Sequence, residues 1–275
     1  MRKKISLLLA LALSLTMVLT GAGSATAKED TSKLNLIKPG SLVVCMTLQF
    51  KPQMYLSATG RPTGYDPELV KRAARDLGLK LEIRNTDFNG LLAGIAAKQC
   101  DLTSVGLGRN ATREQSMTYV KEYVPYATVL GTRRADGTAA TVAAWNSATK
   151  KLTCLKGSLS CTKIKELFPN ATAVEFPTQD ASILEVASGR ADGVVLEANL
   201  LANYSATNPG VLKSVKLDKD INSYWGWWTV QLGNTALRDR LKAWLCEKQE
   251  QGVLNSIYRQ QMGYRMGADL PACTA

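Results

Sequence analysis

The 275-residue sequence has no histidine at all. Without histidine, the chain cannot assemble the Ser-His-Asp or Cys-His systems that activate a nucleophile in many hydrolases. A zinc site made of cysteine and histidine ligands is excluded for the same reason. No Cys-x-x-Cys pair occurs either, which argues against a thioredoxin-type redox site. Any enzymatic chemistry would have to use carboxylates, lysine or tyrosine, and we expect no metal and no cofactor.

The chain also lacks a block of like charges, although it is basic overall. Lysine and arginine number 34 against 23 acidic residues, which gives a formal net charge of +11. The basic residues are scattered, whereas nucleic-acid-binding surfaces concentrate them in a stripe or patch. We therefore expect no nucleic-acid partner, and the charge favours anionic partners or surfaces only modestly.

The first 27 residues have the three parts of a cleavable signal peptide. The basic start MRKK precedes the uncharged run ISLLLALALSLTMVLT, and residues 25–27 (Ala-Thr-Ala) form a cleavage signature. The run is too short to favour a membrane anchor, and no cysteine follows it that could carry a lipid. We predict an exported, soluble mature chain that begins at Lys28. Loss of the three cations in MRKK lowers its formal charge from +11 to +8.

The even number of cysteines favours disulfide bonds in an exported protein. The six positions are Cys45, Cys100, Cys154, Cys161, Cys246 and Cys273. Six cysteines allow 15 connectivities, which sequence alone does not decide. Proximity favours Cys154–Cys161, and we then expect Cys45–Cys100 and Cys246–Cys273.

Strand patterns and helix patterns alternate through the first half of the mature chain. The succession of predicted elements runs through residues 42–47, 65–79, 79–85, 87–99, 100–108 and 110–120, beginning with a strand. The helix pattern YDPELVKRAARDLGL has Asp66 as its expected cap, Pro67 at its first position and Gly78 after its last turn. The alternation predicts an α/β fold with a mainly parallel sheet flanked by helices.

A weak internal repeat indicates two lobes of similar plan. Residues 90–106 and 181–197 both read as a helix, a polar corner, an aspartate and a strand. The corner aspartates, Asp101 and Asp192, are expected to be structural. Residues 123–134 and 221–232 are the candidate crossover strands. We predict lobe 1 at residues 28–130 and 228–275, and lobe 2 at residues 131–227.

The stretch GLGRNATREQ places a positive charge in an unusual position. Asn110 reads as the cap of a helix, so Arg113 falls in the first turn, where the positive macrodipole disfavours a cation. The segment follows a predicted strand, at the edge of a parallel sheet where ligands bind. Arg113 could therefore receive a carboxylate in bidentate fashion. The alternative is that Arg113 pairs with an acid such as Glu114 on a solvated face.

Four segments in the same order resemble the family 3 extracellular solute-binding proteins, which are the periplasmic amino-acid receptors of ABC importers. They are GRPTGYDPEL, TDFNGLLAGIAAKQCDLTSVGLGRNATRE, KLTCLKGS and the closing helices at 236–263. The resemblance runs from about Gly40 to Gly263. It implies a type II periplasmic-binding-protein fold whose lobes, joined by two crossover strands, close on a free amino acid. It also implies periplasmic localisation, an ABC permease as partner, and a monomeric receptor without a cofactor.

The resemblance assigns roles to four polar or backbone positions. Arg113 matches the arginine that clamps the ligand's α-carboxylate, and Asn110 stands where a threonine donates to that carboxylate. Gly108 stands where a backbone group meets the ligand. Glu197 matches the aspartate that binds the amine, although a glutamate reaches one methylene further. An alternative for Glu197 is an acid that stabilises a helix N-terminus.

Two aromatic positions and one loop also correspond to the family's site. Phe50 matches the aromatic that stacks on ligand side chains, and Phe88 matches an apolar wall position. Packing in the core is the alternative for both. In the loop that opens lobe 2, Ser158 and Ser160 would supply hydroxyl and backbone donors, close to the expected Cys154–Cys161 bond.

Three departures from the family bear on the ligand. Residues 47–49 are Thr-Leu-Gln where receptors for cationic amino acids usually have an acid, which argues against a cationic ligand. Lys51 and Arg109 are basic where the family has small or apolar residues. If either faced the pocket, an acidic ligand side chain would be favoured, and solvated surface positions are the alternative.

Two other functions use the same scaffold. A periplasmic dehydratase or lyase would use Glu197 as its general acid if burial raised the pKa of that carboxyl. A ligand sensor would have to act through a separate signalling partner. We expect a polar amino acid or similar small carboxylate as ligand, and a binding protein rather than an enzyme.

Overall fold

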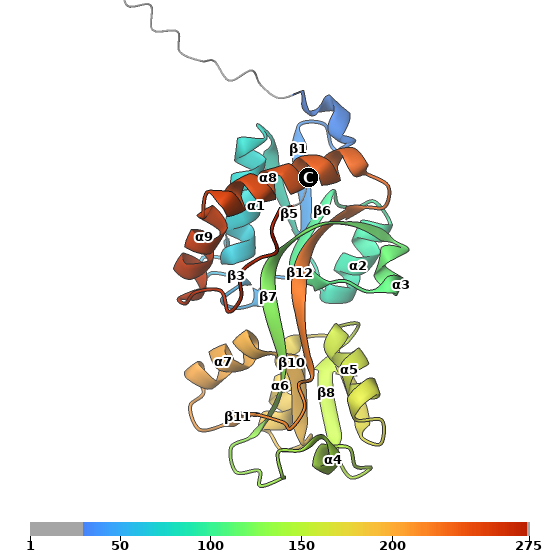
Figure 1. The fold of residues 1–275 in the computed structure, drawn as a ribbon, viewed down its shortest axis with the longest axis vertical. Coiled ribbons are helices and arrows are strands. Elements are labelled where there is room, and N and C mark those ends of the chain that lie inside the picture. Colours follow the sequence, from blue (N-terminus) through green and yellow to red (C-terminus); the bar gives the residue numbers. More distant parts are fainter. Residues whose placement is uncertain (1–29, 274–275) are drawn as a thin grey trace, which may run out of the picture.

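The computed structural model describes residues 30–273, which form two bodies joined by two long strands (Figure 1). The predicted signal peptide lies outside the described residues. Strands β7 (Met117–Arg133) and β12 (Asn222–Gln231) run from one body to the other. The predicted lobe boundaries fall inside these strands. We propose these boundaries for the two lobes. Within the described residues, lobe 1 is residues 30–130 and 228–273, and lobe 2 is residues 131–227.

Lobe 1 is the upper body in Figure 1 and consists of the first elements of the chain and its last two helices. Its elements are η1 (Thr31–Leu34), β1 (Ser41–Met46), β2 (Gln49–Phe50), β3 (Met54–Leu56), β4 (Pro62–Thr63), α1 (Tyr65–Asp76), β5 (Lys80–Asn85), α2 (Phe88–Ala96), β6 (Leu102–Gly108), α3 (Ala111–Glu114), α8 (Thr235–Glu250) and α9 (Val253–Met262). Lobe 2 consists of α4 (Val142–Trp145), β8 (Lys151–Leu155), α5 (Leu159–Leu167), β9 (Thr172–Phe176), α6 (Gln179–Ala187), β10 (Gly193–Glu197), α7 (Ala198–Thr207) and β11 (Leu212–Val215).

One sheet runs through both lobes in the described part of the chain. Its strand order is β5-β1-β6-β12-β7-β10-β8-β9, with β11 paired to β7. In lobe 1, β1 lies parallel to β5 and β6; in lobe 2, β8 lies parallel to β9 and β10. The crossover strands β7 and β12 are antiparallel to each other. The predicted α/β class with mainly parallel strands in each lobe is confirmed.

The internal repeat corresponds to the same local structure in both lobes. Asp101 accepts a hydrogen bond from the backbone N–H of Val43 at 2.9 Å, and its own N–H donates to the Val43 carbonyl at 2.8 Å. Asp192 makes the same two bonds with Lys151, at 2.8 and 3.0 Å. Each aspartate therefore ties the start of one strand to the first strand of its lobe, which confirms its structural role.

Helix α1 begins differently from the prediction. Its N-cap is Gly64, with a φ of +117°, and not Asp66. A Cβ at position 64 would lie 2.6 Å from the Pro52 carbonyl oxygen, so only glycine fits there. Asp66 lies one residue inside the helix and is fully buried, because its side chain turns into the core instead of back to the helix start. Gly78 has the left-handed φ of +68° expected after a helix end.

The helix predicted over 110–120 is wrong in length. Helix α3 covers four residues, and β7 begins at Met117. The segment MTYVKEYV is rich in β-branched and aromatic residues, which favour a strand once it pairs with β12. A single turn sums few peptide dipoles, so the macrodipole argument for Arg113 loses most of its weight.

The cysteines form the three expected pairs. The structure joins Cys45 to Cys100, Cys154 to Cys161 and Cys246 to Cys273, with Cα–Cα distances of 5.8, 5.3 and 5.7 Å. The first bond links β1 to the segment just before β6, and the second closes a short loop between β8 and α5. The third ties α8 to the end of the described chain.

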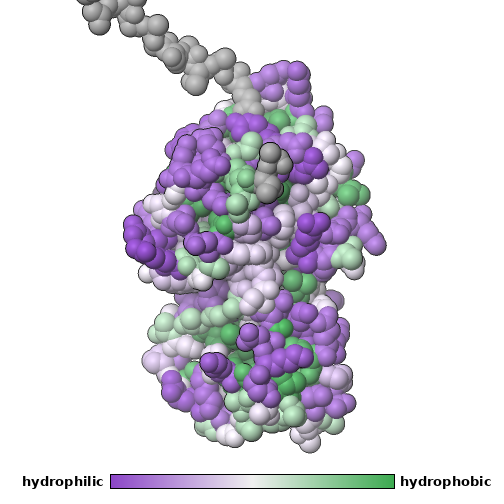
Figure 2. Space-filling model, viewed as in Figure 1, coloured by the Kyte–Doolittle hydropathy of each residue, from purple (hydrophilic) through white to green (hydrophobic). Residues whose placement is uncertain are grey.

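The surface of the two lobes is mostly hydrophilic on the face in Figure 2, above all over lobe 1. The most exposed large hydrophobic side chains come from separate parts of the sequence: Ile37, Leu56, Leu184, Val211, Leu232 and Tyr264. No helix within residues 30–273 is both long and apolar enough to cross a lipid bilayer.

Candidate functional site

A cavity lies between the lobes, beside the crossover strands. Lobe 1 and lobe 2 both contribute to its wall, which is mostly apolar with a few polar groups. The lining residues are Phe50, Gln53, Phe88, Val105, Gly106, Leu107, Gly108, Arg113, Tyr126, Leu155, Ser158, Leu159, Glu197, Asn199, Leu200 and Tyr224. Such a wall, apolar with convergent polar groups, is typical of a small-molecule site.

Arg113 reaches the cavity from α3 and is 7% exposed. Its Nη1 donates to the Gly108 carbonyl at 2.6 Å, and its Nη2 donates across the lobes to the Gly157 carbonyl at 2.9 Å. The guanidinium also lies 5.7 Å from the ring centre of Phe88. Burial lowers the pKa of Arg113, but an arginine stays charged in a protein. The alternative that Arg113 pairs with Glu114 is wrong.

Glu197 supplies the opposite charge from lobe 2. It ends β10 and stands at the N-cap of α7 without using its side chain as a cap. Tyr224 of β12 donates its hydroxyl to Glu197 Oε1 at 2.8 Å. Burial raises the pKa of Glu197, partly offset by this hydrogen bond and by the charge of Arg113. Among the described residues Arg113 and Glu197 form no direct ion pair, so both are available to a ligand with two opposite charges.

Gly108 brings the two lobes close together. Its carbonyl accepts from Arg113, and also from the Tyr119 hydroxyl at 3.2 Å. A Cβ at this position would collide with the Leu159 side chain of lobe 2 and lie 3.0 Å from the ring of Tyr224. The absence of a side chain therefore lets the β6 backbone face lobe 2 directly.

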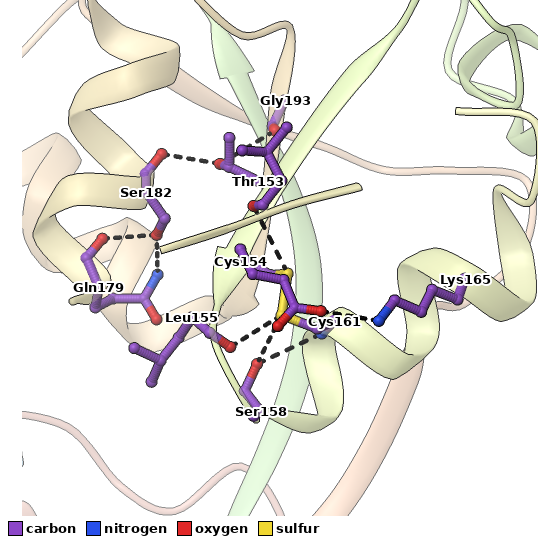
Figure 3. The surroundings of a disulfide bond; sticks show 12 residues. Thr153, Cys154, Leu155, Ser158, Cys161, Lys165, Gln179, Ser182 and Gly193 are labelled. Atoms are coloured by element: carbon purple, nitrogen blue, oxygen red, sulfur yellow. Dashed lines mark hydrogen bonds and ion pairs between the residues drawn. A yellow bond between two sulfur atoms is a disulfide. The ribbon is translucent and has the colours of Figure 1, made fainter. Parts of the chain in front are cut away.

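The lobe 2 loop closes the cavity opposite Arg113. Ser158 caps α5 by accepting from the Cys161 N–H at 3.4 Å, and it lies beside the Cys154–Cys161 bond (Figure 3). The sulfur of Cys161 lies 2.9 Å from the Leu155 carbonyl oxygen. Both Ser158 and Leu155 line the cavity, so the disulfide holds the backbone from which two wall residues project.

The structure places most of the predicted site residues together. Arg113, Gly108, Glu197, Phe50, Phe88 and Ser158 all line the one cavity. Their contacts with a ligand remain a prediction.

Two predicted site residues do not line the cavity. The Asn110 side chain is occupied as a cap, since its Oδ1 accepts from the Arg113 N–H at 2.8 Å. Ser160 is 2% exposed and lies inside α5, where its hydroxyl has no hydrogen-bond partner among the described residues. In this structure the Asn110 side chain is a helix cap and the Ser160 side chain is buried in α5, so neither is placed to donate into the cavity.

Lys51 and Arg109, whose orientation the sequence does not decide, both point away from the cavity. Lys51 is exposed, with its Nζ 5.4 Å from the ring centre of Tyr55. Arg109 forms an ion pair with Glu114 and lies over the ring of Trp227. Neither side chain lines the cavity, so the reason to expect an acidic ligand side chain disappears.

Sequence reasoning missed four polar wall residues: Gln53, Tyr126, Asn199 and Tyr224. Tyr126 and Tyr224 lie in the predicted crossover strands, and their rings are 5.2 Å apart. Asn199 follows Glu197 by two residues. These three could have been inferred from their neighbours, whereas no sequence signal points to Gln53.

Gln53 is held in place by a buried carboxylate. Asp66 accepts from Gln53 Nε2 at 2.7 Å and from the hydroxyls of Ser104 and Tyr123. The Tyr123 hydroxyl in turn accepts from the Gly106 N–H at 2.6 Å. Burial raises the pKa of Asp66 to about 6, against the lowering effect of these three hydrogen bonds. Asp66 thus organises one wall of the cavity from beneath.

Comparison with known proteins agrees with this architecture. Residues 42–264 match the family described as bacterial extracellular solute-binding proteins, family 3. The L-cystine-binding protein TcyA of Bacillus subtilis (strain 168) is 26% identical over 277 residues, which cover 96% of this chain and 98% of TcyA.

Two solved structures show the same fold. The amino acid ABC transporter substrate-binding protein AbpA from Streptococcus pneumoniae, bound to L-arginine, has a TM-score of 0.75 at 24% identity and covers 82% of this chain and 95% of its own. The ancestral amino acid-binding protein AncCDT-1, a precursor of cyclohexadienyl dehydratase, has a TM-score of 0.74 at 22% identity, with coverage of 81% and 96%. The predicted fold class is confirmed.

Proposed function

The chain belongs to the bacterial extracellular solute-binding proteins of family 3, and we propose that it is the substrate-binding component of an ABC importer for a free amino acid. One observation carries the proposal. Arg113 from lobe 1 and Glu197 from lobe 2 line the same cavity. A zwitterion between them would be oriented at both ends and would hold the lobes together.

The carboxylate of the ligand is assigned to Arg113. The guanidinium now donates to the carbonyls of Gly108 and Gly157, and an arginine has further N–H donors in its fork. The ammonium is assigned to Glu197 and to Asn199, whose Oδ1 is buried without a hydrogen-bond partner among the described residues. Phe50 and Phe88 would pack against the remaining part of the ligand.

Closure would follow from the two crossover strands. The Arg113–Gly157 hydrogen bond and the contact between Gly108 and Leu159 join the lobes beside the cavity. Bending within β7 and β12 would separate these contacts and open the site, as hinge closure does in periplasmic binding proteins.

The cellular context is part of the same proposal. Relatives are named as amino-acid-binding proteins and as parts of ABC transporters. We assign this chain to the periplasm, as a monomer that delivers its ligand to a membrane permease. No nucleic acid is involved.

The test is the melting temperature of the mature, oxidised, ligand-stripped protein with each amino acid and with small carboxylates. A ligand at a thousand times its Kd adds about 4 kcal/mol to stability, which raises Tm on the order of 10 °C for a chain of this size. We expect a shift with one ligand class, lost in Arg113→Ala. No shift with any amino acid would refute the proposal.

One observation favours a second function. Glu197 is a carboxyl group whose pKa burial raises, beside the Tyr224 hydroxyl, and a general acid requires such a group. A lyase or dehydratase acting on a small acid would use it to protonate a leaving group. Turnover of a bound organic acid, abolished in Glu197→Gln while binding persists, would identify the enzyme; binding without turnover supports the receptor.

A further inference from the structure

The charges of the cavity limit what the ligand can carry. Among the described residues that line it, only Arg113 and Glu197 are charged. The carboxylate of an amino acid would pair with Arg113 and its ammonium with Glu197, so both charges of the cavity would be matched. A charged side chain of the ligand would then lie among these wall residues without a counter-ion, which is unfavourable for a charge removed from water. The remainder of the ligand is therefore uncharged.

Gln53 is the polar group best placed to recognise that remainder. It is 2% exposed and lines the cavity, and its amide is held by Asp66, which is fully buried. An ionised carboxylate only accepts hydrogen bonds, so the group facing Asp66 must be the Gln53 NH2, as the 2.7 Å bond from Nε2 has it.

The orientation of the amide leaves its oxygen as an acceptor. Rotating the side chain by half a turn would bring Oε1 against an Asp66 carboxylate that already accepts from Ser104 and Tyr123. Gln53 Oε1 therefore faces away from Asp66, on a side chain that lines the cavity. A carbonyl oxygen has two lone pairs, so it can still accept a donor from a ligand.

The ammonium does not require this acceptor. It has three N–H groups, and lobe 2 offers the Glu197 carboxylate and the unpartnered Asn199 Oδ1. These acceptors lie on the N-terminal turn of α7, whereas Gln53 precedes β3 in lobe 1 beside Phe50. Gln53 Oε1 is therefore available to accept a hydrogen bond from the ligand's side chain.

We propose that Gln53, positioned by Asp66, is a specificity-determining residue that accepts a hydrogen bond from an uncharged, donor-bearing side chain such as an amide or a hydroxyl. The inference rests on the proposed function, since it assumes that an amino acid occupies the cavity. It goes further by naming the class of side chain and the atom that recognises it.

The experiment measures Kd by titration calorimetry near neutral pH with isosteric pairs of L-amino acids. Asparagine is compared with leucine, threonine with valine, and glutamine with 5-methylnorleucine, with arginine and glutamate as charged probes. Wild type, Gln53→Leu and the matched control Gln49→Leu are compared. Gln49 bonds to Thr47 and does not line the cavity.

In wild type we expect at least one donor-bearing member to bind about tenfold more tightly than its isostere, as one neutral hydrogen bond allows. Gln53→Leu should bring that ratio close to one, mainly by weakening the donor-bearing member. Gln49→Leu should keep the wild-type ratio, and the Tm of each ligand-free variant checks its folding.

Three results would overturn the inference. Tightest binding of arginine or glutamate would show that the cavity accepts a charged side chain. An equal loss for both members of a pair in Gln53→Leu would mean that Gln53 contacts the ammonium or only supports the wall. Binding of no amino acid by wild type would refute the proposed function together with the inference, and this sets it apart from the first two results.

Discussion

The two lobes contribute to the cavity in different ways. On the lobe 1 side, Gln53 is hydrogen-bonded to Asp66, and Asp66 also binds Ser104 and Tyr123. On the lobe 2 side, Asn199 Oδ1 has no hydrogen-bond partner among the described residues. Lobe 1 therefore presents a wall that is already organised, whereas lobe 2 presents a group that a ligand would satisfy.

This difference assigns distinct roles to the lobes. A wall whose side chains are fixed by buried hydrogen bonds loses little conformational entropy when a ligand binds. An acceptor left without a partner in a closed site is costly, so a ligand that donates to it favours closure. We infer that lobe 1 sets the position of the ligand and that lobe 2 gains stability from its presence.

The largest expected effect comes from removing the charge on either side. Arg113→Ala should weaken binding of the ligand found in the amino-acid panel by about a thousandfold, because it removes a buried charge and its donor fork. Glu197→Gln should weaken binding by about tenfold to a hundredfold, since the amide can still accept from Tyr224 and from the ammonium. Calorimetric Kd values for the two variants provide the comparison.

The control is Arg109→Ala, which removes an exposed arginine four positions before Arg113. Arg109 is paired with Glu114 outside the cavity, so its variant should bind like wild type. A greater loss in Glu197→Gln than in Arg113→Ala would reverse the roles that we assign to the lobes.

The disulfides differ between the lobes as well. Cys45–Cys100 in lobe 1 closes a separation of 55 residues, and Cys154–Cys161 in lobe 2 closes one of 7. In the loop-entropy description, replacing the first pair by alanines should lower the free energy of unfolding by about 4 kcal/mol, and the second pair by about 2 kcal/mol. Urea unfolding of the two double variants measures both values.

Ligand affinity should follow the opposite order. The Cys154–Cys161 loop carries Ser158, and Leu155 follows Cys154 directly. Removing the disulfide therefore loosens two residues of the cavity wall. We expect a severalfold increase in Kd for the lobe 2 variant and little change for the lobe 1 variant. Equal effects on affinity would mean that the short loop keeps its conformation without the bond.

Much of this architecture is predictable because local patterns determine it. The corner aspartates Asp101 and Asp192 stand at the same place in a repeated pattern, and a polar residue between a helix and a strand is well placed to bond the neighbouring strand. Arg113 could be placed in the site because it follows a strand end, where an α/β sheet presents its side chains to a ligand. Glu197 could be placed there because the chain resembles the family 3 solute-binding proteins.

The rest depends on contacts between distant segments. An Asp-Pro pair at a helix start looks the same whether the carboxylate caps the helix or enters the core, so Asp66 was misplaced. Asn110 caps its helix as predicted, but that role removes its side chain from the site. Gln53 gains its meaning only from Asp66, 13 residues away, and no periodicity or motif encodes that pairing.

The pH dependence of stability tests the organised wall of lobe 1. Burial raises the pKa of Asp66 from 3.8 to about 6, so the folded protein holds a proton there more tightly than the unfolded chain does. The stability from this group is therefore fully present below about pH 4, falls as the pH rises, and is lost above about pH 6. A shift of about two pKa units corresponds to ~3 kcal/mol.

Other carboxyl groups also titrate in this range, so the measurement compares wild type with Asp66→Asn, which has no proton to lose at that position. The difference in unfolding free energy between the two proteins, obtained from urea titrations, should change by ~2.4 kcal/mol between pH 4 and pH 7, with wild type favoured at the acidic end. Parallel curves would mean that Asp66 keeps its ordinary pKa. The Asp66 carboxylate would then be accessible to water, and the lobe 1 wall would not be held by a buried hydrogen-bond network. The proposed difference between lobe 1 and the unpartnered Asn199 Oδ1 of lobe 2 would then be wrong.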